Sequence, residues 1–517
     1  MGTQEVKSTI KTQSKDPDTI NTIIRWASSG DGLYGRNNIL INASVEDFYN
    51  DPFGVIEKNI THILSSHKKN VAQMEYLINY EKGQQDILNK TRANGNSKIN
   101  NKHVTNYAWE FVNFKKGYYV GKPIKYVDLN EEKNDRMKLF NRYIRDVNKA
   151  SKDLVKYENM LIMGIAHTMT IPKKRDYNIE YESPYDYTIL DNKDVCVVKS
   201  TDIYKTKLFS MCFSKMLEND GTEYDIFTIY YDFKFLQLKY SNSELILINS
   251  GKMPVKDCIT EYQLNEQRMG IFEPVINALN SMNTISSNQI DQLEESVNTY
   301  LTFENVDISS ITSNIDTFRE KRILVVNTSN PEAPAKIGSV KIENDNTSIN
   351  EKYKSIEQRT YDIVGVPMPT SSTGQGVSGE AQQYGGGWEN AQNIALVDTQ
   401  YIMQFEKEDL QKFIYISKSA VNSKIDKNLF ASDIEIKYTI NKSNNMQTKA
   451  QSMTYYIDKG FTREQALTFC EITDDPQTEG KIADENYELQ KQKDLEYTRQ
   501  QKKIESEFTQ KQNTKEN

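Results

Sequence analysis

The best candidate for a phosphate-binding loop is Gly117-Tyr-Tyr-Val-Gly121-Lys122-Pro123. A P-loop needs four residues between its glycines, so that backbone N–H groups curl around phosphate, and a hydroxyl side chain after the lysine to hold magnesium. This segment has three residues between the glycines, and Pro123 follows the lysine. A tight turn between strands therefore explains it better than a nucleotide site.

A serine nucleophile is the second chemistry to consider, within Gly374-Gln-Gly376-Val-Ser378-Gly379. The nucleophile elbow has the pattern G-x-S-x-G, whereas here Gly379 follows Ser378 directly and Glu380 takes the place of the final glycine. A serine triad would also need a histidine base, and the chain offers only His62, His67, His103 and His167. The pattern predicts no catalytic serine.

The spacing of histidines and cysteines predicts no metal site. His62 and His67 are five residues apart, so they do not share a helix face as the two histidines of H-E-x-x-H do. The cysteines lie far apart and fit a reducing compartment rather than a disulfide framework; they are Cys196, Cys212, Cys258 and Cys470. We therefore expect no catalytic residue, no metal and no cofactor.

Composition points to a multidomain chain with much polar surface. The 517 residues exceed the roughly 250–300 that one core supports. Only 37% of them are hydrophobic, but 31 Tyr and 19 Phe argue against general disorder. The net charge of −8 argues against a protein that grips nucleic acid through bulk positive charge. No apolar run approaches the ~18–20 residues of a membrane span.

Hydrophobic periodicity divides the chain into helical and β-rich sections. It predicts helices over 60–80, 135–166, 273–303, 348–366 and 388–424, and a small helical region over 446–472. The helix over 388–424 would be about 50 Å long. A strand and turn are predicted after Tyr107, a run of half-buried strands over 168–265, and further strands over 323–326 and 434–440. Residues 483–517 read as either a solvated helix or a disordered tail.

The unusual feature is the segment over 367–387, which joins two of the predicted helices. It is rich in Gly, Ser, Thr and Pro, and Glu380 is its only charged residue before Trp388. Loops of about twenty residues inside a domain are usually functional or disordered. A plain linker and a functional loop both remain open at this point.

Several segments, taken in order, resemble those of the portal proteins of tailed bacteriophages, in the siphophage-type group. They are FVNFKKGYYVGKPIKY (111–126), MLIMGIAHTM (160–169) with IEYESPYDYTILDNKDVCVVKS (179–200), INALNSMNTISSNQIDQLEESVNTYLTF (276–303), YDIVGVPMPTSSTGQGVSGEAQQ (361–383) and FTREQALTFCEITDDPQTEGKIADE (461–485). The resemblance covers roughly residues 40–485 and rests on the ordered set rather than on one motif.

The resemblance implies an α+β portal fold with long stem and tunnel helices, a β-rich wing, a small α/β clip and a helical crown. It divides the chain into an N-terminal arm and wing (1–272), stem helices (273–303 and 346–366), a clip (304–345), a tunnel loop (367–387), a long helix that returns to the wing (388–440), a crown (441–482) and a charged tail (483–517).

The resemblance also implies a function and a set of partners. We expect a homo-oligomeric ring of about a dozen subunits at one capsid vertex of the virion, with host cytoplasm as the place of assembly. Double-stranded DNA would pass through the ring non-specifically during packaging and ejection. The expected protein partners are terminase, head-completion and connector proteins, and the major capsid and scaffolding proteins. The portal itself would not be an enzyme, and no membrane is expected to be involved.

The residues expected at the DNA channel follow from the tunnel loop and the second stem helix. The loop candidates are Thr370, Ser371, Ser372, Thr373, Gly374, Gln375, Gly376, Ser378, Gly379 and Glu380. Their hydroxyls and amide would make weak, replaceable hydrogen bonds, and their glycines would let the loop change shape. The candidate channel-facing basic residues are Lys352, Lys354 and Arg359; plain surface charge and intersubunit pairing explain them equally well.

Two other functions compete with this interpretation. An NTP-dependent enzyme acting on DNA would need the P-loop or the acidic metal cluster that the sequence lacks. Another virion component of baseplate or scaffold type would need no channel, but it would leave the glycine-rich loop between helices unexplained.

Overall fold

The computed structural model describes residues 35–91, 99–129, 135–173, 182–217, 223–241, 244–296, 300–305, 330, 332–334, 336–340, 346–368, 387–440, 446–470, 472–473 and 476–513. It divides into two units, Met1–Ser371 with Gly385–Ile440 and Ser372–Tyr384 with Asn441–Asn517. The architecture mixes helix and sheet, which confirms the α+β class.

A six-stranded sheet with the order β1-β5-β6-β7-β8-β9 forms one end of the first unit. Its strands are β1 (Ile39–Ile41), β5 (Val195–Ser200), β6 (Lys207–Leu217), β7 (Glu223–Tyr231), β8 (Lys234–Ser241) and β9 (Glu244–Lys252). β1 runs parallel to β5, and the other neighbours are antiparallel. The sheet confirms the β-rich section predicted from alternating residues.

Helices α2 (Val45–Asn50) and α3 (Pro52–Glu81) pack against this sheet. Asp51 caps the N-terminus of α3, because its side chain accepts a hydrogen bond from the N–H of Gly54 at 3.0 Å, and Pro52 occupies the first position of the helix. Both features favour a helix start. Ile56, Ile60 and Ile63, spaced for one helix face, enter the core beside the strands.

The larger core of the first unit lies between helices and two smaller sheets. One sheet has the order β10-β3-β4, and the other pairs β13 with β2. These strands are β2 (Lys125–Asp128), β3 (Ile165–Pro172), β4 (Tyr185–Leu190), β10 (Ile259–Gln263) and β13 (Ile434–Lys437). The helices around them are α4 (Tyr107–Val120), α5 (Asp135–Asp146), α6 (Lys149–Met163) and α12 (Trp388–Ser419), with the short turns η1 (Asp86–Asn89), η3 (Asn192–Asp194) and η5 (Ala431–Asp433).

The strand and turn predicted after Tyr107 are present only in part: residues 107–120 form helix α4 instead, and a bend at 121–122 then leads to strand β2 (Lys125–Asp128). Aromatic and β-branched residues favoured a strand by propensity, but their burial follows a helical spacing. The buried positions include Ala108, Phe111, Val112, Lys115 and Tyr119. Nothing lies within 4 Å of the place where a Cβ of Gly117 would stand.

The single long helix predicted over 135–166 is interrupted. Asn148 adopts the left-handed conformation (φ 52°) and separates α5 from α6. α6 ends at Gly164 (φ 77°), and Ile165 already belongs to β3. A Cβ at Gly164 would lie 2.1 Å from the carbonyl oxygen of Arg268, so only glycine fits this corner.

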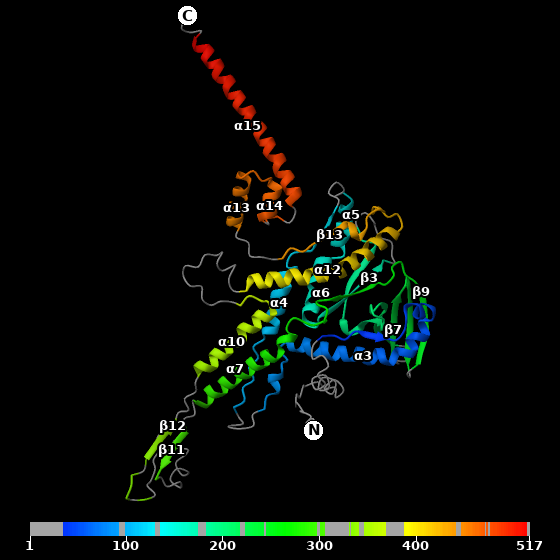
Figure 1. Cartoon of the computed structure of the whole chain (residues 1–517), viewed down its shortest axis with the longest axis vertical. Coiled ribbons are helices and arrows are strands. Elements are labelled where there is room, and N and C mark those ends of the chain that lie inside the picture. The colour runs from blue at the N-terminus through cyan, green and yellow to red at the C-terminus, as the bar shows by residue number, and fades with distance from the viewer. Residues whose placement is uncertain are drawn as a thin grey trace. The chain divides into compact units, whose positions relative to one another are not determined.

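The helices predicted over 273–303 and 348–366 are present as α7 (Ile276–Ser296), preceded by the turn η4 (Glu273–Val275), and α10 (Asn346–Val364). We call them the stem helices, after the role expected of them. The predicted extension of the first helix to Phe303 is wrong, since Tyr300–Glu304 is strand β11, paired antiparallel with β12 (Lys336–Val340). Figure 1 shows α7 and α10 side by side and leading towards this hairpin. The strand predicted over 323–326 lies outside the described residues.

The second unit is helical where it is described. It contains α13 (Met446–Asp458), α14 (Arg463–Cys470) and α15 (Pro476–Asn513). The first two confirm the helical region predicted over 446–472. α15 includes most of the charged tail, for which the sequence left a helix and disorder open. Arg463 holds its beginning by an ion pair with Asp484 at 3.0 Å.

Candidate functional site

The stem pair α7 and α10 is joined by polar contacts as well as by apolar packing. Across the pair, Nε2 of Gln289 donates to Oδ1 of Asn350 at 2.9 Å. α10 is also tied to α4, because the hydroxyl of Tyr107 donates to Glu357 at 2.6 Å. A second hydrogen bond joins the same two helices: the hydroxyl of Tyr361 on α10 donates to Glu110 on α4 at 2.8 Å. The second stem helix is therefore fixed in register on the body of the unit.

The three basic candidates on α10 are exposed, but they do not form one patch. Lys352 and Arg359 are seven residues apart, so they share a helix face. Lys354 follows Lys352 by two residues and lies about 200° around the helix. The structure thus brings Lys352 and Arg359 to the same side of α10 and places Lys354 on another.

The loop candidates Thr370–Gly376, Ser378, Gly379 and Glu380 lie outside the described residues. The two ends of this loop are described, and they meet. α10 ends at Gly365 (φ 66°), whose N–H and that of Val366 donate to the carbonyls of Asp362 and Tyr361, a Schellman motif. α12 begins after Gly387 (φ 88°), where an added Cβ would lie 3.6 Å from Cα of Pro367.

Trp388 anchors the start of α12 and with it the root of the loop. Its ring centroid lies 5.7 Å from that of Phe114 and 6.2 Å from that of Tyr118, both on α4. Nδ2 of Asn390 donates to the carbonyl of Asp362 at the end of α10. A Cβ at Gly365 would lie 2.2 Å from Cδ1 of Ile394, so α10 and α12 approach closely here.

Further along α12, buried charges fix the helix to the part of the unit that precedes residue 273, which we call the wing after the role expected of it. Oε1 of Glu406 lies 2.5 Å from Nζ of Lys149, and Oε2 lies 2.9 Å from Nζ of Lys156. Asp153 pairs with both lysines, at 2.9 and 2.7 Å. Burial alone would raise the pKa of Glu406, but Lys149 and Lys156 outweigh it and hold that pKa far below its usual range.

Tyrosine hydroxyls complete these interactions. Tyr126 donates to Oε1 of Glu406 at 2.6 Å, and Tyr262 donates to Oε2 of Glu406 and to Asp409. Nearer the loop root, Tyr119 donates to Asp398 at 2.6 Å. Burial raises the pKa of Asp398 and that of Asp409. The long helix therefore cannot slide along the wing without breaking buried hydrogen bonds.

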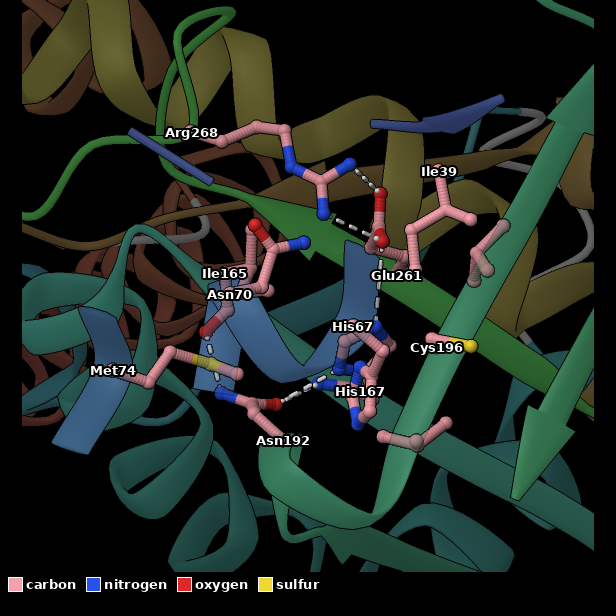
Figure 2. Close-up of a pocket in the computed structure, with 12 residues that line it drawn as sticks. Ile39, His67, Asn70, Met74, Ile165, His167, Asn192, Cys196, Glu261 and Arg268 are labelled. Carbon is pink, nitrogen blue, oxygen red and sulfur yellow. Dashed lines mark hydrogen bonds and ion pairs between the residues drawn. The ribbon is translucent and has the colours of Figure 1, made fainter. Parts of the chain in front are cut away.

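A small cavity in the wing is the other feature that could hold a ligand. Figure 2 shows its lining, in which Arg268 faces Glu261 and His167 lies between Glu261 and Asn192. Its free volume of about 10 Å³ holds at most one water molecule. Burial lowers the pKa of His67 to about 4, and Nε2 of this histidine contacts the carbonyl of Lys193. Most of these polar groups bond to one another, although Nε of Arg268 has no hydrogen-bond partner among the described residues, and so small a cavity is best explained as part of the wing core.

Within the described ranges, no group of three or more His, Cys, Asp or Glu side chains is placed to hold a metal ion. Cys196, Cys212, Cys258 and Cys470 are free thiols. No helix in the described part of the chain combines the length and apolar character needed to cross a bilayer.

Comparison with known protein families identifies the class to which this chain belongs. The model of a family described as "Phage portal protein, SPP1 Gp6-like" matches residues 60–502. Because the match covers most of the chain, this protein belongs to the phage portal protein family, and the resemblance is confirmed. The family is structural rather than enzymatic and is associated with the capsid vertex and DNA packaging. No curated protein matches the chain.

The sequence pattern does not predict the root of the loop or its anchor on α4. A strand over Phe114 and Tyr118 would not give these residues the common face that they share with Phe111 on the helix. A count of apolar positions at helical spacing over 107–120 would have revealed that face. The close approach at Gly365 has no such signal, because it depends on Ile394, which is 29 residues away in the sequence.

Proposed function

We propose that this chain forms a ring of about a dozen subunits at one capsid vertex, through which duplex DNA enters during packaging and leaves at infection. The observation that carries the proposal is the family match over 60–502. The paired helices α7 and α10, rooted in the body and joined at their far ends by the β11–β12 hairpin, support it.

The parts of the chain take the following roles in this proposal. α7 and α10 are the stem, and residues 304–345 are the clip that meets terminase and, later, the head-completion and connector proteins. Residues 367–387 form the tunnel loop, and 441–482 form the crown inside the capsid. Contacts with major capsid and scaffolding proteins belong to assembly in the host cytoplasm, and the mature protein belongs to the virion.

Charge supports a conduit that does not hold its cargo. Duplex DNA presents one negative charge per ~1.7 Å, and each neutralised phosphate adds affinity. A micromolar hold on DNA would be worth about 8 kcal/mol, which would oppose every packaging step. From Ile276 to Ile290, α7 contains no Asp, Glu, Lys or Arg. On its exposed face lie Asn277, Ser281, Thr284 and Asn288, all small and uncharged.

Electron microscopy of the purified full-length chain tests the proposal. We expect closed rings whose central hole admits duplex DNA. Monomers or open filaments under all salt conditions would overturn the ring, and the baseplate or scaffold alternative would then account better for the chain. A second test addresses the loop: Gly374→Pro with Gly376→Pro should block packaging more than ring assembly. Normal packaging by that variant would remove the loop's role.

A further inference from the structure

Residues 85–91 and 99–106, which we call the strap, lie along α7, and Asn106 leads directly into α4 (Figure 1). Three alternate strap residues donate backbone hydrogen bonds to side chains of α7: Asn101 to Oδ1 of Asp291 (2.6 Å), His103 to Oγ of Ser287 (2.9 Å) and Thr105 to Oδ1 of Asn283 (2.8 Å). We call these three hydrogen bonds the ladder.

The ladder matches the repeat of an extended chain to that of a helix. Two extended residues advance about 6.6 Å, and four helical residues advance about 6.0 Å. Every second strap amide therefore meets the next turn of α7. The three acceptors on α7 are almost fully buried, with Asn283 and Ser287 at 0% and Asp291 at 1% exposed. A buried acceptor that loses its donor is costly, so strap and helix must keep their register.

Contacts at both ends extend the ladder over most of α7. At the C-terminal end of α7, which we call the far end of the stem, Asp291 also accepts a hydrogen bond from Nζ of Lys90 at 2.8 Å. Nδ2 of Asn101 donates there to Oε2 of Glu294 at 2.8 Å. At the near end, Nδ2 of Asn280 donates to Asp86 at 2.8 Å. Glu294 lies two residues before the end of α7, so the strap is fixed to the part of the stem next to the β11–β12 hairpin.

The other end of the strap leads to the root of the loop. Tyr107, the residue after the strap, opens α4. α4 places Phe114 and Tyr118 against Trp388, and the hydroxyl of Tyr119 donates to Asp398 in α12. One continuous stretch of chain thus joins the far end of α7 to the start of α12, separately from the path along α7 and α10 themselves.

We propose that the strap and α4 couple the far end of the stem to the root of the loop, so that a displacement at one is felt at the other. Each strap amide of the ladder pairs with an acceptor on a separate turn of α7, so the strap can shift along α7 only by a whole helical turn. One-turn shifts of this kind occur at other helix interfaces. This inference rests on the proposed function, in which the far end of the stem meets the packaging motor and the loop meets DNA.

Amide hydrogen exchange on the full-length protein tests the coupling. Ser287→Ala and Asp291→Ala each remove one acceptor of the ladder. Ser281→Ala is the matched control, because Ser281 is exposed on the same helix and its hydroxyl donates to the carbonyl of Asn277 instead. We expect the two ladder variants to speed exchange at least about threefold in α4 and in the first turns of α12, and the control to leave both unchanged.

The location of the faster exchange decides between coupling and a local effect. Faster exchange confined to the strap and α7, with α12 unchanged from Trp388 onward, overturns the coupling, as does an equal effect of Ser281→Ala. Ser287→Ala removes only a hydroxyl, so it should fold even if Asp291→Ala does not. Ring formation by the same samples in electron microscopy judges the proposed function separately, because the exchange pattern is read whether or not rings form.

Discussion

Replacing Glu406 with Gln should strongly destabilise the wing. Glu406 is fully buried and accepts from Lys149, Lys156, Tyr126 and Tyr262. In Glu406→Gln, the two buried lysines keep only Asp153 as a charged partner, so one positive charge loses its compensation. Removing one partner of a buried ion pair costs about 3–5 kcal/mol. The amide would also point an N–H₂ group at donors, which adds to the loss.

Glu408→Gln is the matched control for this change. The Glu408 side chain is 40% exposed and lies 3.0 Å from Nζ of Lys412. The Lys412 side chain is buried, but without Glu408 it keeps Asp409 at 3.9 Å as a charged partner, so the loss should be about 0–1 kcal/mol, as for exposed pairs. Urea unfolding followed by far-UV circular dichroism, at one protein concentration, should show a lower midpoint for Glu406→Gln and almost none of that shift for Glu408→Gln. Equal midpoints for the two variants would refute the claim that the network fixes α12.

Acid adds an independent check on the same residue. The pKa of Glu406 in the folded chain is held far below its usual value of 4.5. The ionised Glu406 therefore stabilises the fold fully above about pH 4.5, and this contribution is lost as the pH falls below 4.5 towards the pKa of the folded state. The unfolding free energy of the unmodified chain should therefore decline in this acidic range more steeply than that of Glu406→Gln. Parallel declines would show that Glu406 is not ionised in the folded wing.

Three further expectations follow. Burial lowers the pKa of His67 from 6.5 to about 4, so between these pH values its imidazole binds a proton in the unfolded chain but not in the folded one. The free energy of unfolding should therefore fall by up to about 3 kcal/mol as the pH is lowered from 6.5 to 4, and urea titrations of His67→Gln should show a smaller fall. Gly365→Ala should destabilise by about 1–2 kcal/mol because of its positive φ, whereas Gly117→Ala should stabilise by about 0.5–1 kcal/mol, both read from unfolding midpoints; the same sign for both would contradict the backbone assignment. If the ring retains DNA, Lys352→Gln with Arg359→Gln should lower the salt slope of retention by about one unit for each phosphate that is no longer neutralised; an unchanged slope would exclude that face.

Sequence reasoning predicted the elements whose pattern is long and consistent. The helix over 60–80, the β-rich section and the two stem helices carry an unbroken period, and each is present. The errors occur where one residue breaks a pattern. Asn148 and Gly164 interrupt a helix that hydrophobicity alone continues, and α7 stops before Tyr300 because strand β12, distant in sequence, offers a partner. Tertiary contacts determine where such helices end, and the local periodicity of the sequence does not reveal those contacts.

Some features of the candidate site could likewise be predicted from the sequence, and others could not. Lys352 and Arg359 could be placed on one helix face from spacing alone. The ladder could have been suspected from Asn283, Ser287 and Asp291, which recur at helical spacing where apolar residues would be expected. Its partner could not, because the strap is polar and has no periodicity that links it to α7. Hydrogen bonds between distant segments leave little trace in either segment read by itself.

The many tyrosines explain how a chain with 37% hydrophobic residues keeps such long helices in place. An apolar stripe holds two helices together but lets them slide, because apolar attraction has no direction. A tyrosine adds to its apolar ring a hydroxyl that needs one partner in one position. Such hydroxyls meet carboxylates along α10 and α12: Tyr107 with Glu357, Tyr361 with Glu110, Tyr119 with Asp398, Tyr126 with Glu406 and Tyr262 with Asp409. In the proposed ring, the channel wall would have to keep its register while a polyanion moves past it, and this fixation would serve it better than a larger apolar core.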